Sequence, residues 1–212
     1  TFVGRQRELG EIESLLLDDG CRLVTLLGPG GVGKTRVALA VAQHVGERFA
    51  DGAVFVALDG VSSATDVPQA IAAALGAGSG DGDVFVHVAS LLADTETLLV
   101  LDNFEHVLDA ADVVTQLLDA CPSTKVLVTS RSLLGLQAEW VYSLEGLAYP
   151  QAPAVLSEIT EFDAVTLFVA RARRVKQSFQ ITEADIPALI RLCRLLEGAP
   201  LAIELAASWA RA

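Results

Sequence analysis

The chain has 212 residues, a hydrophobic fraction of 52% and a formal net charge of −12 at pH 7. Its length suits one large domain or a domain with a smaller companion, and no apolar stretch reaches the roughly 18 residues that span a bilayer. The acidic excess lies in residues 1–150, with 8 basic and 20 acidic side chains, whereas residues 151–212 are neutral overall. Since an acidic surface repels a phosphate backbone, we expect no direct nucleic-acid binding by this segment and no membrane partner.

The three cysteines, Cys21, Cys121 and Cys193, stand far apart and show no metal-ligand spacing. Isolated cysteines of this kind are typical of buried free thiols in a reducing compartment. We therefore predict a cytoplasmic protein with three free thiols.

Strand-like and helix-like segments alternate along the first two thirds of the chain. Short Val-, Leu- and Phe-rich runs predict strands at 22–27, 53–58, 97–102, 125–130 and 140–144. Helices are predicted between them at 34–49, 66–75, 83–93 and 105–120, with a glycine-rich loop at 76–83. This alternation is typical of an α/β fold with a five-stranded parallel sheet flanked by helices.

The first predicted strand leads into residues 28–35, Gly-Pro-Gly-Gly-Val-Gly-Lys-Thr, a complete GxxxxGK[ST] phosphate-binding loop. Successive glycines let backbone N–H groups curl around a polyphosphate, and the helix that follows directs its positive end at the same anion. Lys34 is expected to reach the outer phosphates, and the Thr35 hydroxyl to bind Mg²⁺. The nucleotide contacts predicted in this segment are Gly30, Gly31, Val32, Gly33, Lys34, Thr35 and Arg36.

The strand at 97–102 ends in Asp102, which we expect to hold Mg²⁺ opposite Thr35. The next residue is Asn103, whereas vigorous ATPases of this class carry a glutamate there. An amide orients water but cannot take its proton, so we expect slow hydrolysis. Glu105 is either a substitute base or an acid in the first turn of the next helix, and we favour the second interpretation.

The strand at 125–130 is followed by Arg131. Ligands of an open parallel sheet lie at the carboxyl ends of its strands. If this strand lies beside the phosphate-loop strand, the Arg131 guanidinium arrives near the outer phosphate and could distinguish a triphosphate from a diphosphate. The alternative interpretation is a surface arginine at a strand end.

The pattern changes near residue 148. Pro150 and Pro153 interrupt it, and helices are predicted at 161–176, 183–196 and 200–211. We therefore expect a P-loop nucleotide-binding domain over residues 1–148 and a small all-helical subdomain over residues 149–212.

Five motifs occur together in a fixed order. They are residues 2–9, the phosphate loop, the Leu-Asp-Asn strand end, Thr129-Ser130-Arg131, and residues 197–207. In this combination the chain resembles the signal-transduction ATPases with numerous domains (STAND), in particular the NB-ARC-like modules of large bacterial transcriptional regulators of the SARP and LuxR types. The family's winged-helix segment would follow beyond residue 212.

The resemblance implies roles for particular residues. Val3, Gly4 and Arg5 would lie along the adenine and ribose, and Arg131 would be the sensor arginine. Residues 198–201 match the family's GxPL signature, in which Pro200, followed by Leu201, packs against the base. A proline in a first helical turn suits both the helix and a flat apolar base.

These features predict an ATP- or ADP-binding regulatory switch with slow Mg²⁺-dependent hydrolysis, in which Lys34, Asp102, Asn103 and Arg131 form the catalytic set. Its expected partners are the adenine nucleotide, other domains of the same full-length chain and, in one nucleotide state, further copies of itself. One alternative is a remodelling ATPase of the related AAA+ class. Another is a small-molecule kinase, whose arginine-rich lid would have to come from Arg171, Arg173 and Arg174.

Overall fold

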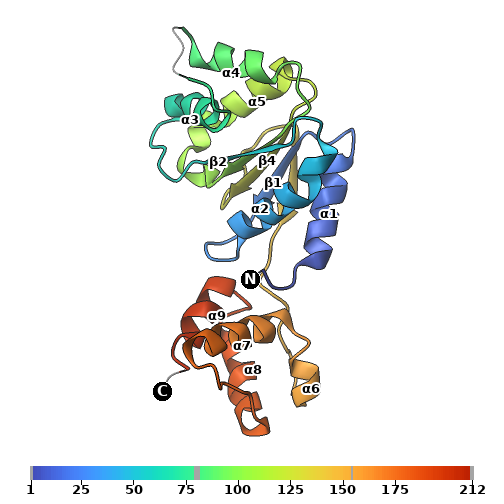
Figure 1. The fold of residues 1–212 in the computed structure, drawn as a ribbon, viewed down its shortest axis with the longest axis vertical. Coiled ribbons are helices and arrows are strands. Elements are labelled where there is room, and N and C mark those ends of the chain that lie inside the picture. The colour runs from blue at the N-terminus through green and yellow to red at the C-terminus, as the bar shows by residue number, and fades with distance from the viewer. Residues whose placement is uncertain (1, 79–81, 154, 211–212) are drawn as a thin grey trace. The chain divides into compact units, whose positions relative to one another are not determined.

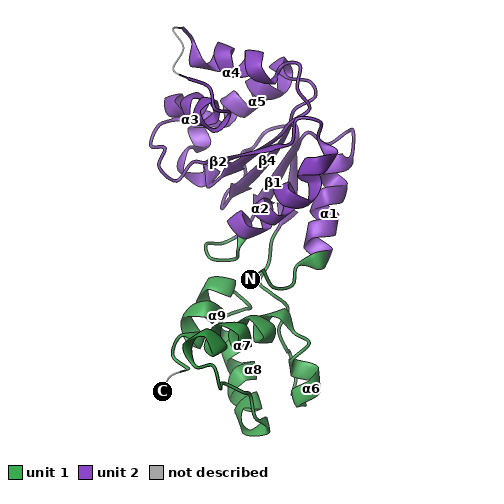
Figure 2. Cartoon of the chain, viewed as in Figure 1, with its two compact units in different colours: residues 1–6, 29–33, 144–212 green, residues 7–28, 34–143 purple. Residues whose placement is uncertain are grey.

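The computed structural model describes residues 2–78, 82–153 and 155–210 (Figure 1). The chain divides into two compact units, coloured separately in Figure 2. Residues 7–28 and 34–143 form one, here called the sheet unit, and residues 1–6, 29–33 and 144–212 form the other, the helical unit. The domain boundary expected at residue 148 stays a prediction.

The sheet unit contains five parallel strands in the order β2-β3-β4-β1-β5. Their bounds are β1 Leu23–Leu27, β2 Ala53–Ala57, β3 Leu98–Asp102, β4 Lys125–Ser130 and β5 Glu139–Ser143. All five predicted strands are therefore present within one residue of their expected ends. The predicted α/β class and the five-stranded parallel sheet are confirmed.

Register and burial explain why these apolar runs form strands. Leu23, Val126 and Leu99 pair across three neighbouring strands and are fully buried on one face of the sheet. Because successive side chains point to opposite faces, the intervening Val100 and Leu127 lie on the other face, and they are fully buried as well. Burial on both faces is what a near-continuous apolar strand requires.

Helices cover the sheet. They are α1 Gln6–Leu17, α2 Lys34–Val45, α3 Val67–Ala74, α4 Val84–Leu92 and α5 Ala111–Ala120, joined by short 3₁₀ turns at Gly46–Arg48, Ala64–Asp66, Phe104–His106 and Leu108–Ala110. The α2 helix packs against four of the strands, and α3, α4 and α5 contribute to the core on the face of Leu99. The α1 helix was not predicted, although Leu9, Ile12 and Leu16 are buried along one of its sides.

The predicted helix at 105–120 is wrong in its first half. Asn103 adopts a left-handed conformation with φ of 70°, and the chain then makes two 3₁₀ turns before α5 begins at Ala111. Phe104 is fully buried there. Tertiary packing thus overrides the helical propensity of the segment.

The helical unit contains α6 Leu156–Ile159, α7 Asp163–Val175, α8 Ile186–Leu195 and α9 Pro200–Ala207, with a 3₁₀ turn at Glu183–Asp185. Its core gathers side chains from all four helices, among them Ile159, Val165, Cys193 and Ile203. The predicted helices at 161–176 and 183–196 are confirmed, and the last ends at Ala207 rather than at 211.

Two predicted features extend beyond the described residues. Residues 79–81 of the loop at 76–83 and the final residue of the predicted helix at 200–211 lie outside them. Across the described ranges, no helix is both long and apolar enough to cross a membrane.

Candidate nucleotide-binding site

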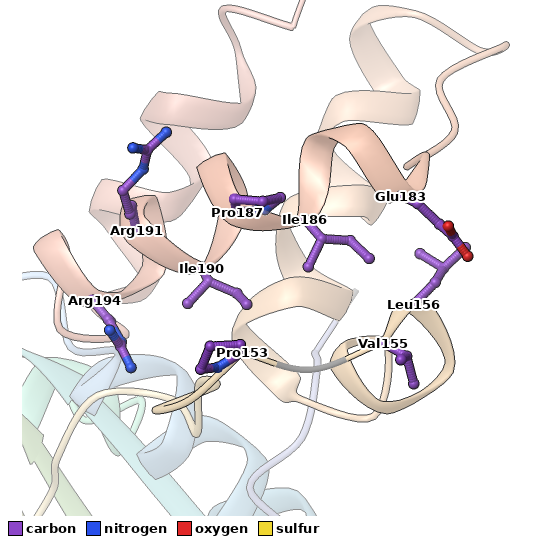
Figure 3. A pocket seen from close by; sticks show the side chains of 9 residues that line it. All are labelled: Pro153, Val155, Leu156, Glu183, Ile186, Pro187, Ile190, Arg191 and Arg194. Atoms are coloured by element: carbon purple, nitrogen blue, oxygen red, sulfur yellow. The ribbon is translucent and has the colours of Figure 1, made fainter.

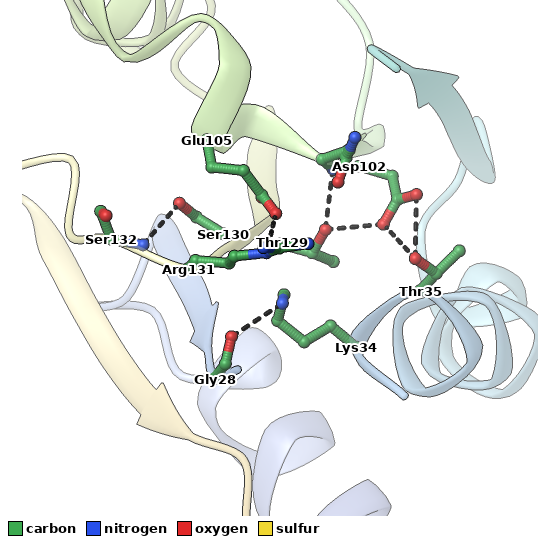
Figure 4. A network of polar contacts seen from close by, with 10 residues as sticks. Gly28, Lys34, Thr35, Asp102, Glu105, Thr129, Ser130, Arg131 and Ser132 are labelled. Atoms are coloured by element: carbon green, nitrogen blue, oxygen red, sulfur yellow. Dashed lines mark hydrogen bonds and ion pairs between the residues drawn. The ribbon is translucent and has the colours of Figure 1, made fainter. Parts of the chain in front are cut away.

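The phosphate loop leaves β1 at the carboxyl end of the sheet. Its Gly28 N–H donates to the carbonyl of Ser130, at the end of the neighbouring β4, over 3.2 Å. Lys34, the first residue of α2, is 8% exposed, and its Nζ donates to the Gly28 carbonyl over 2.8 Å (Figure 4). The lysine head therefore lies back over the start of its own loop.

Burial lowers the pKa of the Lys34 ammonium, and nearby Arg131 acts in the same direction, whereas Glu105 and Asp102 oppose it. Burial disfavours the charged form of an ammonium group. A polyphosphate beside Lys34 would favour the charged form, as Glu105 and Asp102 do, so the electrostatics of this lysine suit an anion-binding role.

A second cluster joins the start of α2 to the end of β3. The Thr35 hydroxyl contacts both Asp102 carboxylate oxygens, at 2.9 and 3.0 Å (Figure 4). Asp102 is 8% exposed and also accepts a 2.6 Å hydrogen bond from the Thr129 hydroxyl at the end of β4. Thr129 in turn accepts the backbone N–H of Asn103 over 2.9 Å. The carboxylate is thus held by two hydroxyls.

This cluster fits a magnesium ion. Mg²⁺ prefers oxygen ligands and takes only one or two carboxylates from a protein, with waters and substrate phosphates completing its shell. Thr35 and Asp102 supply a hydroxyl and a carboxylate within hydrogen-bond distance of each other. In the part of the chain that the structure describes, no group of three or more His, Cys, Asp or Glu side chains could hold a metal ion. The waters and phosphates of a bound nucleotide would therefore have to complete the shell.

Arg131 follows β4, which pairs directly with β1 as the prediction for this arginine required. Its Nε lies 3.0 Å from Glu105 Oε1, and the two side chains are 61% and 10% exposed (Figure 4). Glu105 Oε2 is buried and has no hydrogen-bond partner. Glu105 does lie in the first turn of a helix, but this helix is the short 3₁₀ turn Phe104–His106 and not α5, and its carboxylate faces Arg131.

The middle of the phosphate loop belongs to the helical unit. Gly31 has φ of 79°, and its carbonyl accepts the Leu201 N–H of α9 over 3.2 Å. A Cβ on Gly31 would lie 3.0 Å from the Leu201 Cβ, and one on Gly33 would lie 3.9 Å from the Pro200 ring. Glycine is therefore needed at Gly31 both for its backbone conformation and for the approach of α9.

The N-terminal segment contacts the same part of the loop. Arg5, which is 4% exposed and has φ of 68°, donates to the carbonyls of Val32 and Glu145 over 3.3 and 2.6 Å. Val3 packs against the core of the helical unit. At Gly4, with φ of 67°, a Cβ would overlap the Asp163 carboxylate.

The structure therefore brings together two groups of predicted site residues. Lys34, Thr35, Asp102 and Arg131 gather at the carboxyl ends of the strands in the sheet unit. Val3, Gly4 and Arg5 lie in the helical unit, as do Gly31–Gly33, Pro200 and Leu201. Gly30 and Arg36 are exposed, and Asn103 contributes a backbone contact to Thr129.

Two residues of the site were not predicted. Thr129 positions Asp102, and the sequence signal for it was a hydroxyl residue at the end of a strand beside one that ends in aspartate. Glu105 was considered as a substitute base or, preferably, as a first-turn helix acid, but not as a partner of Arg131.

A separate cavity of about 520 Å³ lies in the helical unit (Figure 3). It is lined mainly by apolar side chains, with Glu183, Arg191 and Arg194 at its margins. No predicted site residue lines it.

A family model described as an AAA domain matches residues 17–136, which is more than half of the chain. This chain belongs to the AAA domain family. The matched segment contains the phosphate loop, Asp102 and Arg131, so the family assignment rests on the same elements that form the polar cluster of the sheet unit. The family assignment and the phosphate loop both indicate a nucleotide-binding domain.

Two curated relatives come from Mycobacterium tuberculosis. An uncharacterised protein, Rv0894, is 37% identical over 210 residues, which are 98% of this AAA domain chain and 50% of the relative. A protein named as an HTH-type transcriptional regulator, Rv0890c, is 38% identical over 192 residues, covering 90% of the chain and 20% of the regulator. The chain thus spans about half the length of the first relative and a fifth of the second.

Among solved structures, the STAND protein PH0952 of Pyrococcus horikoshii, which has a tetratricopeptide repeat sensor, is similar with a TM-score of 0.54. The two are 20% identical, over 95% of this chain and 29% of the other. At this identity the likeness concerns the fold. Together with the regulator relatives, it confirms the resemblance to STAND modules that the five sequence motifs indicated.

Proposed function

We propose that this AAA domain is the ATP- and ADP-binding switch module of a bacterial transcriptional regulator, and that it hydrolyses ATP slowly with Mg²⁺. The observation that carries the proposal is the polar cluster of the sheet unit. There, Lys34 lies at the loop and the Thr35 hydroxyl contacts the Asp102 carboxylate at 2.9 Å. We assign Lys34 to the phosphates, and Thr35 and Asp102 to Mg²⁺.

Slow hydrolysis is proposed from the residue that follows Asp102. Asn103 cannot take a proton from water, and its left-handed backbone is fixed by the hydrogen bond to Thr129. We assign Asn103 to orienting the attacking water and Arg131 to sensing the outer phosphate. Turnover should then fall far below the enzyme median of about 10 s⁻¹.

The adenosine is assigned to the residues of the helical unit and the loop. Val3, Gly4 and Arg5 would line the adenine and ribose, and Pro200 with Leu201 would contact the base. The backbone of Gly30, Gly31, Val32 and Gly33, with Arg36 at the start of α2, would complete the nucleotide contacts. The hydrogen bond from Leu201 to Gly31 supports this assignment because it holds the start of α9 against the phosphate loop.

A switch requires that the nucleotide bind two arrangements with different affinity. Moving from 1:99 to 99:1 between arrangements takes about 5.5 kcal/mol of differential binding. Nucleotide contacts that are complete in only one of the two arrangements could generate this difference. The partners proposed for the module are the other domains of its full-length chain and, in the ATP state, further copies of itself in the cytoplasm.

A remodelling ATPase of the AAA+ class is the second candidate, and the family match over residues 17–136 favours it. Steady-state turnover distinguishes the two, because a remodelling ATPase would hydrolyse ATP rapidly, whereas the proposed switch hydrolyses it slowly. A small-molecule kinase is disfavoured, because Arg171 pairs with Glu204 at 2.8 Å and Arg173 donates to the Phe179 carbonyl. Two of the three arginines that a kinase lid would need thus serve contacts within the helical unit.

Titration calorimetry with ADP·Mg²⁺, together with steady-state turnover of ATP·Mg²⁺, tests the proposed function. The wild-type chain should bind ADP tightly and turn over slowly, and Lys34→Ala should bind neither nucleotide. Arg48→Ala, a change of an exposed basic residue in the 3₁₀ turn after α2, is the matched control and should leave binding unchanged. Fast turnover by the wild-type chain would contradict the switch.

A further inference from the structure

The ion pair between Glu105 and Arg131 has a feature that a structural salt bridge does not need. The Glu105 side chain is nine-tenths buried, but only one of its oxygens has a partner, Arg131 Nε at 3.0 Å. The other oxygen, Oε2, is buried without a hydrogen bond. An ion pair kept for stability would satisfy both oxygens, because an unsatisfied buried carboxylate oxygen costs free energy.

The pair also lies beside the phosphate end of the loop. The charges of Glu105 and Arg131 both act on Lys34, the residue assigned to the outer phosphates. In Figure 4 the side chains of Glu105, from the turn after β3, Arg131, just after β4, and Lys34, at the start of α2, point toward one another. A carboxylate at this place carries the same sign of charge as a phosphate and accepts the same hydrogen bonds from a guanidinium.

We propose that Glu105 is a specificity-determining residue that makes the nucleotide site favour a diphosphate over a triphosphate. The inference rests on the proposed function. Glu105 holds the Arg131 guanidinium that the outermost phosphate would otherwise bind. A triphosphate must therefore displace Glu105 from Arg131 and tolerate a buried carboxylate nearby, whereas a diphosphate, which lacks the outermost phosphate, leaves the pair intact.

This arrangement gives the switch a preferred resting state. Arg131 alone would favour the triphosphate, because a guanidinium stabilises the additional negative charge. Glu105 reduces that advantage in proportion to the free energy of the pair. Since the Arg131 side chain is 61% exposed, the free energy of this ion pair is modest. A triphosphate can therefore still bind in preference to a diphosphate when an additional contact supports it.

Calorimetric titration of the full chain with ADP·Mg²⁺ and with a non-hydrolysable ATP analogue and Mg²⁺ tests the proposal. The measured quantity is the ratio of the two dissociation constants. Glu105→Gln keeps the shape of the side chain and removes its charge, so it should shift the ratio toward the triphosphate by about two- to fivefold. Glu105→Asp keeps the charge on a shorter side chain and should shift the ratio in the same direction by less.

Asp109→Asn is the matched control. It removes one negative charge from an exposed residue of the same segment and should leave the ratio unchanged. An unchanged ratio in both Glu105 variants would overturn the proposal. Loss of ATP hydrolysis in Glu105→Gln with an unchanged ratio would also overturn it, and would make Glu105 the base. If the wild-type chain binds neither nucleotide, the proposed function itself fails.

Discussion

At the scale of single residues, the site depends on how firmly the Asp102 carboxylate is held. Thr35 and Thr129 donate to it from α2 and β4, and Thr129 also fixes the backbone of Asn103. Hydrogen bonds to an ionised group are stronger than neutral ones, and they fix its orientation before a ligand arrives. Thr129 is thus a positioning residue for the proposed metal site.

Thr129→Val tests this role. The change keeps the side-chain shape but removes the hydroxyl that joins Asp102 to the Asn103 backbone. The affinity for ADP in the presence of Mg²⁺ should fall about tenfold, which corresponds to one hydrogen bond to a charged group. The affinity for ADP measured in EDTA should stay constant. Calorimetry under both conditions gives the two values.

Thr124→Val is the control for that change. The Thr124 hydroxyl is buried and has no hydrogen-bond partner, so its removal should leave nucleotide binding unchanged. If Thr124→Val and Thr129→Val reduced the Mg²⁺-dependent affinity equally, Thr129 would have no particular role.

The cysteines give a second prediction at this scale. Burial raises the pKa of Cys21 and Cys121, and raises that of Cys193 to about 11. A raised pKa keeps a thiol protonated at pH 8, and the thiolate is the reactive form. A thiol reagent at pH 8 should therefore label none of the three in the folded chain and all three in guanidinium chloride. Rapid labelling of Cys193 in the native chain would contradict its burial in the helical core.

Motif spacing alone predicted that Lys34, Thr35, Asp102 and Arg131 lie near strand ends of the sheet, because the ends of these strands are visible in the sequence, and the roles of the four residues stay predictions. Glu105 could not be assigned in the same way. Its role depends on Asn103 adopting a left-handed conformation, which turns the chain away from a helix and toward Arg131. Asparagine tolerates that conformation better than most residues, but local sequence alone does not decide whether it is used.

At the scale of elements, the turn before α9 is tightly constrained. Gly198 has φ of 68°, and a Cβ on it would overlap the Leu147 carbonyl oxygen. The Gly198 carbonyl also accepts the Leu147 N–H over 2.8 Å. This turn fixes where α9, and with it Pro200 and Leu201, begins.

Gly198→Ala should therefore lower the free energy of unfolding by at least about 2 kcal/mol, from strain and from the collision. Gly10→Ala is the matched opposite case, because Gly10 lies inside α1 with nothing within 4 Å of an added Cβ. That change should raise the free energy of unfolding by about 0.5–1 kcal/mol. Urea denaturation followed by circular dichroism measures both. Equal stability of the two variants would contradict this account of the turn.

The strands were predictable because burial on both faces leaves continuous apolar runs, as in Leu98–Asp102. The α1 helix was missed although its buried residues recur at helical spacing, and Gly10 in its centre weakens the propensity signal. The helix predicted over 105–110, which is absent from the structure, has the opposite explanation, because there the propensity signal is strong. Its composition is helical, but the burial of Phe104 and the Glu105 ion pair hold it in 3₁₀ turns.

At the scale of the whole molecule, the phosphate loop is divided between two compact units. Residues 29–33 group with α9 and the N-terminal segment, whereas Gly28 and Lys34 group with the sheet. The sequence predicted a sheet domain and a helical subdomain, but not this division, because it arises from the Leu201 and Arg5 contacts to the loop.

Thermal melting of the chain with and without ADP·Mg²⁺ tests the central claim most directly. A ligand at 1,000 times its dissociation constant adds about 4 kcal/mol to the stability of the form that binds it. For a chain of this size that increment corresponds to a rise in Tm of roughly 8–16 °C. We predict such a rise for the wild-type chain and none for Lys34→Ala. An unchanged Tm of the wild-type chain at millimolar ADP·Mg²⁺ would contradict the account.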